Sequence, residues 1–280
     1  MLRTSALLVT CALAVSLSAA CTLKNNAALA QDASGAEDVN ATESDIESLG
    51  SSFITPDGAS VATAQSWTPG SGDFALQDNG SQTTGNPGFF FQPAGCLQVT
   101  VDKLKEQASY VFAGCTGPLG LVELNGTVNV SWSTSGGALT VDFSAADFKI
   151  NRATITQWSA TAVVTANGAA RELKWTGMLS GTTGAGRPFQ RTNDKDLKWT
   201  VGVECLSISG QSTGNILKAN LQTTIVDYQR CADSCPQAGS EIQVKNLDNG
   251  DSIDIKYAGG PTATLTLNGK SEPIGLACGE

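Results

Sequence analysis

Four carboxylates lie on or near stretches of sequence that alternate like β-strands: Glu123, Asp142, Glu172 and Glu204. A pair of carboxylates, one protonated and one ionised, can hydrolyse a glycosidic bond. Hydrolysis by a carboxylate pair needs no histidine and is therefore compatible with this sequence. The absence of histidine excludes Ser-His-Asp and Cys-His catalysis. Strict alternation places these side chains away from the apolar face of their strands. We therefore expect solvated carboxylates and no catalytic residue.

A second acidic group, Asp248-Asn249-Gly250-Asp251 with Asp254, contains the oxygen ligands that calcium prefers. Its spacing departs from that of an EF-hand loop, and no glutamate follows at the bidentate position. Asp, Asn and Gly are equally typical of a hairpin turn. We expect a turn here, with no metal ligand and no cofactor.

A long glycine-bearing loop at residues 182–190 contains one base, Arg187, and is followed by two more, Arg191 and Lys195. The loop lacks the Lys and the Ser or Thr that a phosphate-binding P-loop requires. The bases could receive an anionic partner, or the segment is simply a long hairpin loop. Nucleic acid is not an expected partner, because the net charge of −9 opposes binding to phosphates.

Aromatic residues offer two further interpretations. Trp132, Trp158, Trp175 and Trp199 could line a glycan platform or an apolar ligand cavity. Each lies on the apolar side of its segment, which favours packing in the core. The run of phenylalanines at residues 89–91 is either an exposed patch for a partner or a first strand or plug packed on the core, and we expect the second.

Period-two alternation recurs along residues 122–132, 139–143 and 197–203, which is typical of half-buried strands. Turn pairs such as Asn167-Gly168, Asn249-Gly250 and Asn268-Gly269 separate such runs. We predict an all-β domain over residues 88–280, an antiparallel meander that forms a sandwich or a curved, barrel-like sheet.

The turn pairs also predict strand registers. A two-residue turn at Asn167-Gly168 places Ala162 opposite Leu173, and one at Asn249-Gly250 places Val244 opposite Ile255. If Cys96 faces Cys115 across a hairpin, Val99 meets Phe112 and Val101 meets Tyr110. The disulfide would then lie on the outer, polar side of the sheet.

Six of the eight cysteines remain once Cys11 is removed with a leader and Cys21 is set aside. An even number in an exported chain predicts three disulfides. The pair Cys96–Cys115 follows from the hairpin above. The other four cysteines allow three pairings, of which we choose Cys205–Cys231 and Cys235–Cys278. A redox role for Cys231 and Cys235 is disfavoured, because three residues separate them rather than two.

The first twenty residues have the pattern of a secretory signal peptide, a basic start followed by an uncharged apolar run. Ser18-Ala19-Ala20-Cys21 resembles the lipobox of bacterial lipoproteins, although a leucine is preferred where Ser18 stands. The resemblance implies a lipid on Cys21 and, because Thr22 is not Asp, a place at the outer membrane of the cell envelope. The alternative is ordinary cleavage, after Ala20 or after Ala30, giving a soluble secreted or periplasmic protein.

Residues 22–95 contain nine acidic residues against one base, Lys24, and so carry nearly all of the chain's net charge. Low hydrophobicity with high net charge opposes folding. We predict a flexible acidic tether over residues 21–87. A short helix at residues 41–51 has only weak support, because Gly50 interrupts it and no apolar stripe is present.

The C-terminal segment contains Cys235-Pro236, Asn249-Gly250, Leu267-Asn268-Gly269 and Cys278. It resembles the corresponding region of uncharacterised bacterial envelope lipoproteins. The resemblance covers about two-thirds of the chain, implies an exported β-rich domain and adds no chemistry.

Together these features predict a membrane-anchored, non-enzymatic binding or structural module. Its expected partner is the membrane, through Cys21; the sequence defines no other ligand. One alternative is a carrier of a lipid or other apolar molecule, and a second is a carboxylate-dependent glycan hydrolase.

Overall fold

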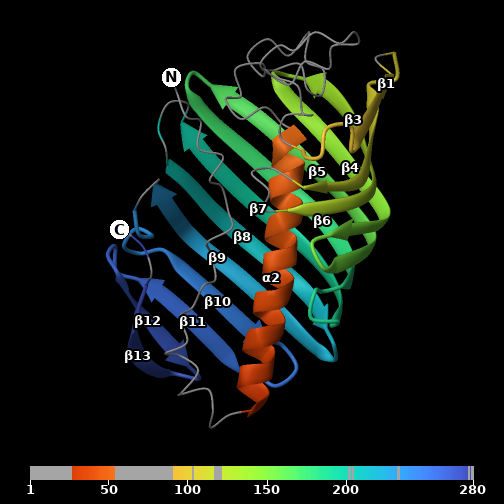
Figure 1. The fold of residues 1–280 in the computed structure, drawn as a ribbon. Coiled ribbons are helices and arrows are strands. Elements are labelled where there is room, and N and C mark those ends of the chain that lie inside the picture. Colours follow the sequence, from red (N-terminus) through yellow and green to blue (C-terminus); the bar gives the residue numbers. More distant parts are fainter. Residues whose placement is uncertain are drawn as a thin grey trace.

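The computed structural model describes residues 27–53, 91–102, 104–116, 122–200, 203, 205–231, 234–276 and 278. These residues form one antiparallel sheet and one long helix, α2 (Ala27–Phe53) (Figure 1). The strands are β1 (Leu97–Asp102), β2 (Gln107–Thr116), β3 (Glu123–Ser135), β4 (Ala138–Ile150), β5 (Ala153–Asn167), β6 (Ala170–Thr182), β7 (Pro188–Thr200), β8 (Cys205–Ile216), β9 (Ala219–Cys231), β10 (Glu241–Asn246), β11 (Ser252–Tyr257), β12 (Thr262–Leu267) and β13 (Lys270–Gly275).

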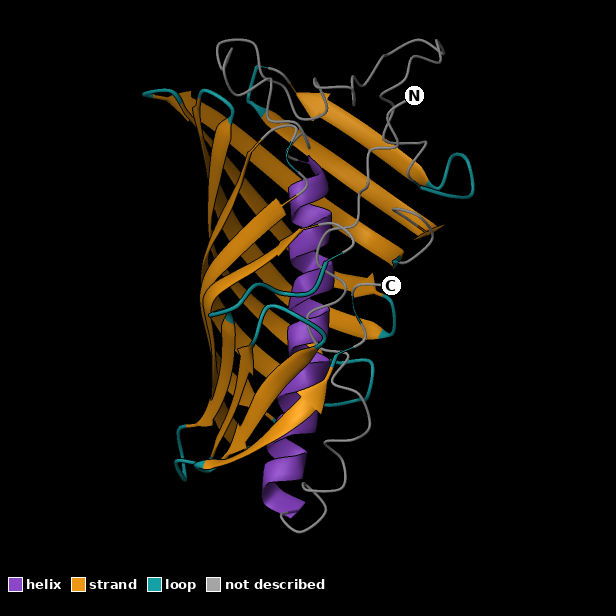
Figure 2. Ribbon diagram, turned by 90° about the vertical axis from the view of Figure 1, so that its left-hand side faces the viewer, coloured by secondary structure: helices purple, strands orange, loops and turns teal. Residues whose placement is uncertain are grey.

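The sheet is a simple meander in which every strand pairs with the strand that follows it. The 13 strands lie in the order β1 to β13, so β1 and β13 are the two edges and the sheet does not close. Figure 2 shows the sheet curving around α2, which lies in the trough on its inner face. The predicted all-β meander is confirmed, and it takes the form of one curved sheet rather than a sandwich.

The apolar side chains of alternate positions gather on the inner face. In β5, for example, Trp158, Ala160, Ala162 and Val164 are buried, while the intervening residues are more accessible. Phe143 stacks on Trp158 and on Trp175, with ring centroids 5.6 and 5.5 Å apart. We call Phe143, Trp158 and Trp175 the aromatic stack.

Core packing of the tryptophans is confirmed. Trp132, Trp158 and Trp175 are buried, and Trp199 is partly buried against the same core. Phe91 is also buried, with its ring edge-on to Phe112 at 5.2 Å. It therefore packs on the core as expected, whereas residues 89 and 90 lie outside the described part of the chain.

The predicted registers are wrong by two residues. Ala162 lies opposite Trp175 rather than Leu173, because the β5–β6 hairpin turns at residues 168–169. Val244 lies opposite Ile253, because the β10–β11 loop contains five residues rather than two. A shift of two residues returns each side chain to the same face of the sheet. The inner and outer faces were consequently predicted correctly despite the wrong partners.

The three disulfides join the pairs that the sequence analysis chose: Cys96–Cys115, Cys205–Cys231 and Cys235–Cys278. The predicted outer position of Cys96–Cys115 is wrong, since both cysteines are buried in the core. The register of β2 shifts between Phe112 and Cys115, where Gly114 has a φ of 64°. This β-bulge turns Cys115 inward. The same hairpin pairs Val99 with Tyr110, again two residues from the prediction.

Helix α2 corrects the prediction of a tether over residues 21–87. Residues 27–53 are helical, and Ala36, Val39, Ile46 and Leu49 are buried against the sheet. The predicted signal peptide, Cys21, and residues 22–26 and 54–87 lie outside the described residues. Within the described part of the chain, no helix combines the length and hydropathy needed to span a bilayer.

Candidate functional site

The trough that holds α2 contains charged side chains at its centre. Arg191 and Lys195 occupy alternate inward positions of β7, and Arg187 immediately precedes that strand. Because side chains two residues apart in a strand share a face, the interval of four residues directs Arg191 and Lys195 to the same side. We call Arg187, Arg191 and Lys195 the basic row.

Each member of the basic row is paired with an acidic residue of α2. Arg187 Nη1 lies 2.8 Å from Asp38 Oδ2, and Arg191 Nε lies 3.1 Å from Glu43 Oε1. Lys195 Nζ lies 2.6 Å from Glu47 Oε1.

Burial makes these pairs unusual. The side chains of Arg191 and Glu43 are 0% and 1% exposed, so this pair lies fully inside the molecule. Lys195 Nζ also lies 3.7 Å from Glu43 Oε2 and thereby links the two carboxylates of the helix. Arg191, Lys195, Glu43 and Glu47 therefore form a network of charges largely removed from solvent, whereas the Arg187–Asp38 pair is partly exposed.

Neutral polar groups of β8, β9 and α2 complete the network. Arg191 Nη2 donates hydrogen bonds to the Ser212 carbonyl at 2.8 Å and to Thr223 Oγ1 at 3.1 Å. The Thr223 hydroxyl in turn donates to Asn40 Oδ1 at 3.3 Å, and Arg187 Nη2 donates to Ser34 Oγ at 2.9 Å. The inner face of the sheet therefore has a polar region over β7–β9.

Two further contacts fix the helix at points away from the basic row. Asn246 Nδ2 donates to Asp32 Oδ2 at 2.7 Å, near the beginning of α2. Asn151 Nδ2 donates to Asp45 Oδ2, also at 2.7 Å, from the β4–β5 turn.

Burial changes the protonation equilibria in the trough. Desolvation raises the pKa of Glu47, although the nearby Lys195 ammonium opposes this effect. Desolvation alone would lower the pKa of Lys195, but attraction to Glu47 and Glu43 outweighs it and the pKa is raised. Lys195 thus stays charged, whereas burial disfavours the ionised form of the Glu47 carboxyl group because it loses hydration.

Some polar atoms in the trough have no hydrogen-bond partner. Those that take part in no ion pair either are Arg191 Nη1, Asn40 Nδ2 and Asn193 Oδ1, all inaccessible to solvent. A buried donor without an acceptor is costly. The helix thus leaves part of the hydrogen-bonding capacity of Arg191 unused.

Glycines allow α2 and β8 to approach this region closely. A Cβ at Gly50 would overlap the indole ring of Trp175, so the helix backbone rests directly on the aromatic stack. On β8, Gly210 and Gly214 lie opposite Lys195 and Arg191, with φ values of 144° and 155°. These conformations favour glycine.

The carboxylates considered for hydrolysis lie on the other face of the sheet. Glu123 and Asp142 are exposed, and Glu172 is half-buried and 3.8 Å from Lys198 Nζ. Their positions away from the apolar face agree with the prediction, whereas Glu204 lies outside the described residues.

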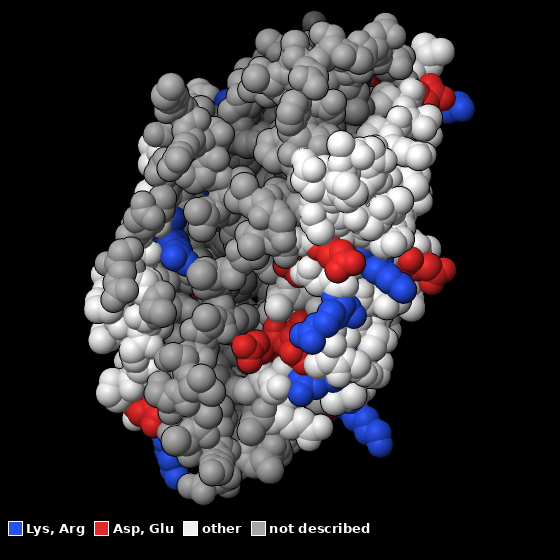
Figure 3. Space-filling view, viewed as in Figure 1, with Lys and Arg blue, Asp and Glu red and all other residues white. Residues whose placement is uncertain are grey.

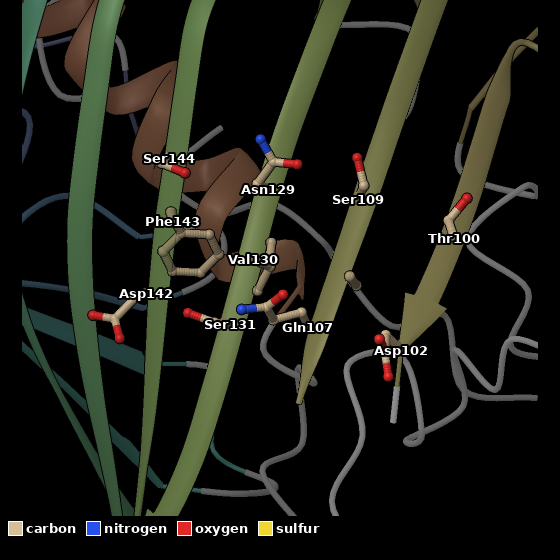
Figure 4. Close-up of a pocket in the computed structure, with 11 residues that line it drawn as sticks. Thr100, Asp102, Gln107, Ser109, Asn129, Val130, Ser131, Asp142, Phe143 and Ser144 are labelled. Atoms are coloured by element: carbon tan, nitrogen blue, oxygen red, sulfur yellow. The ribbon is translucent and has the colours of Figure 1, made fainter. Parts of the chain in front are cut away.

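An outer groove of about 380 Å³ crosses β1–β4, and Figure 4 shows Asp102 and Asp142 at its opposite sides. A general acid for hydrolysis needs a raised pKa. The pKa of Asp102 is instead lowered, chiefly by its hydrogen bond with Lys105. Asp142 accepts a hydrogen bond from Thr161 at 2.6 Å. The groove does not resemble a paired-carboxylate active site.

The acidic group at residues 248–251 forms a hairpin loop. Asp248 accepts a hydrogen bond from the Asn220 backbone, and Asn249 Oδ1 accepts one from the Asp251 backbone. Among the described residues, no three His, Cys, Asp or Glu side chains lie close enough together to hold a metal ion.

Sequence reasoning identified the basic row but not its partners. It considered an anionic partner for these bases only as an alternative to a plain hairpin loop, and in this structure acidic residues of α2 pair with them. On the face seen in Figure 3, the described acidic and basic side chains are interspersed. The signal that was missed is the i, i+4 spacing of Glu43 and Glu47, which puts these two acids on one side of a helix.

We compared the chain with models of known protein families, with curated proteins and with solved structures, and none of them matches.

Proposed function

We propose that this protein is an exported, non-enzymatic binding protein that is anchored to an envelope membrane through Cys21. Its three disulfides indicate an oxidising, non-cytoplasmic compartment. The signal-like first twenty residues and the lipobox-like Ser18-Ala19-Ala20-Cys21 support export and lipidation.

The observation that carries the binding role is the buried charge network between α2 and β7. Ion pairs removed from water contribute little net stability, and apolar residues of similar size are often at least as stabilising. A sheet built only for stability would favour apolar side chains where Arg191 and Lys195 lie. A charged row on the inner face of a trough is better suited to recognising an oppositely charged group.

The position of α2 limits how far the trough can lie from an anchor. The helix begins six residues after Cys21. Six residues reach at most about 20 Å. A lipid on Cys21 would therefore hold the beginning of α2 near the membrane surface, much closer than a tether of 67 residues would.

Detergent phase separation tests the anchor. We expect the mature wild-type protein to enter the detergent phase and Cys21→Ala to remain in the aqueous phase, because an acyl chain adds apolar area. Thr22→Ala is the matched control and should behave like wild type. Equal partitioning of wild type and Cys21→Ala would overturn the proposed anchor.

A further inference from the structure

We propose that the trough beneath α2 is a binding site for an anionic amphiphile, a molecule with a phosphate or carboxylate headgroup and an acyl chain, and that α2 occupies this site until the ligand replaces it. The inference rests on the proposed binding function and names its ligand class.

The headgroup is specified by the basic row. The acids paired with Arg187, Arg191 and Lys195 in the described structure all come from α2. If the helix leaves, three cations remain on the sheet without these counter-charges. A buried cation requires an anionic partner, so whatever replaces α2 here must carry negative charge.

Arg191 also has a donor that its present partners do not use. Its Nε contacts Glu43 and its Nη2 donates to β8 and β9, but its Nη1 has no hydrogen-bond partner. Guanidinium groups bind carboxylate and phosphate oxygens through two parallel hydrogen bonds. The Nη1 and Nη2 groups form one such edge of the guanidinium, and an oxyanion placed there would satisfy the Nη1 donor that α2 leaves unpaired.

The acyl chain is specified by the aromatic stack. Gly50, which lies on Trp175, comes three positions after Glu47, which pairs with Lys195. Three residues of helix rise about 4.5 Å. The charged and aromatic surfaces are therefore adjacent, and Ile46 and Leu49 bury apolar surface in the same two turns. A ligand with a charged end and an apolar end would match both surfaces.

Helix α2 is suited to being displaced. It contains six acidic and no basic residues. When the helix is not paired with the sheet, these negative charges repel one another. Its buried face includes Gly35, Thr42, Glu43 and Gly50 between the apolar residues. Because glycines and mutual repulsion disfavour an isolated helix, α2 depends for its position on its contacts with the sheet, the basic row among them.

The test uses the full mature chain carrying Cys21→Ala, which separates ligand binding from membrane anchoring. We would titrate it with monomeric 1-oleoyl-lysophosphatidic acid, oleate, 1-oleoyl-lysophosphatidylcholine and inorganic phosphate, following tryptophan fluorescence. The first two probes distinguish a phosphate from a carboxylate headgroup. We expect one or both to bind, and the zwitterionic lipid and free phosphate to bind about 10-fold or more weakly.

Variants then locate the site. Arg191→Met should weaken binding of the anionic probe about 10-fold or more, because it removes the central headgroup contact. Lys198→Met is the matched control, since Lys198 lies on the same strand but is exposed, and its binding should equal that of the parent. Any of three results would overturn the proposal: equal binding of all lipid probes, equal losses of binding in both variants, or no binding of either anionic probe.

A helix lock keeps the test decisive if Arg191→Met does not fold. A Cβ at Gly35 would lie 3.3 Å from Ile216 Cγ2, so cysteines at these two positions are well placed for a disulfide. The oxidised Gly35→Cys/Ile216→Cys protein should lose binding because α2 cannot leave. Each single-cysteine variant, with its thiol alkylated, should still bind. Undiminished binding by the locked protein would overturn the displacement of α2, while membrane partitioning of the Cys21-containing chain would stand unaffected.

Discussion

The pair between Arg191 and Glu43 places two opposite charges where neither has access to water. Glu43→Gln removes the negative charge but keeps the shape of the side chain, leaving the guanidinium without its counter-charge. We expect this change to lower the free energy of unfolding by about 3–5 kcal/mol, the range for breaking a buried pair from one side. Urea denaturation measures it.

The control for this prediction is Glu37→Gln, on an exposed position of the same helix. Its effect should stay within about 1 kcal/mol, as for surface charges. A loss for Glu43→Gln no larger than that of Glu37→Gln would contradict the importance of the buried pair. Replacing both partners, as Glu43→Leu with Arg191→Met, should recover much of the loss because no unpaired charge remains.

Glu47 gives the trough a dependence on pH. Its pKa in the folded protein is raised above 4.5 by desolvation. The folded state therefore binds a proton more readily than the unfolded chain, and this residue's contribution to stability increases as pH falls through the raised pKa. The increase is complete below 4.5, the value in the unfolded chain.

The measurement compares wild type with Glu47→Gln, which cannot titrate. The stability of wild type relative to this variant should increase as the pH is lowered through the raised pKa of Glu47 towards 4.5. The same comparison with Glu123→Gln, on the exposed end of β3, should give no such trend. A wild-type advantage that shrank on acidification would mean that Lys195 stabilises the charged carboxylate more than burial penalises it.

At the scale of elements, the strands could be predicted and their exact partners could not. Alternation depends on burial of one face, which a sequence records directly in runs such as Val122–Trp132. Register depends on where a loop closes. The five-residue β10–β11 loop contains Asn249-Gly250 but does not turn at those two residues alone. The inward position of Cys115 depends on the bulge at Gly114, which alternation cannot reveal.

Helix α2 was missed for a different physical reason. The rule that acidic, weakly apolar segments remain unfolded assumes that their charges face water. Here Glu43 and Glu47 find cations about 150 residues away in sequence, on β7. The side of α2 that contacts the sheet is built from glycine, threonine and glutamate as well as apolar residues. The helix is thus specified by the sheet more than by its own sequence.

For the whole molecule, the meander means that each strand pairs only with its chain neighbours. Helix α2 is the described element that joins distant strands, since it contacts β4 as well as β8, β9 and β10. The disulfides add covalent links near both edges, at Cys96–Cys115 and Cys235–Cys278. In such a quasi-linear arrangement, loss of one bridging element should destabilise the strands that it contacts and leave distant strands unchanged.

Gly50→Ala tests this view, because the new methyl group would overlap Trp175, which is fixed by its stacking with Phe143. The substitution raises intrinsic helix propensity by about 1 kcal/mol, so any loss of protection must come from undocking. We expect faster amide hydrogen exchange in α2 and in β7–β9, and unchanged exchange in β12 and β13.

Gly35→Ala provides the matched comparison for that experiment. Its methyl group would meet only the Ile216 Cγ2 atom, at 3.3 Å, near the end of a side chain that can adjust slightly. Exchange in this variant should therefore remain close to that of wild type. If Gly50→Ala instead increased exchange uniformly from β1 to β13, the helix would be part of one cooperative folding unit. It would then be a structural core element that no ligand could replace without unfolding the sheet.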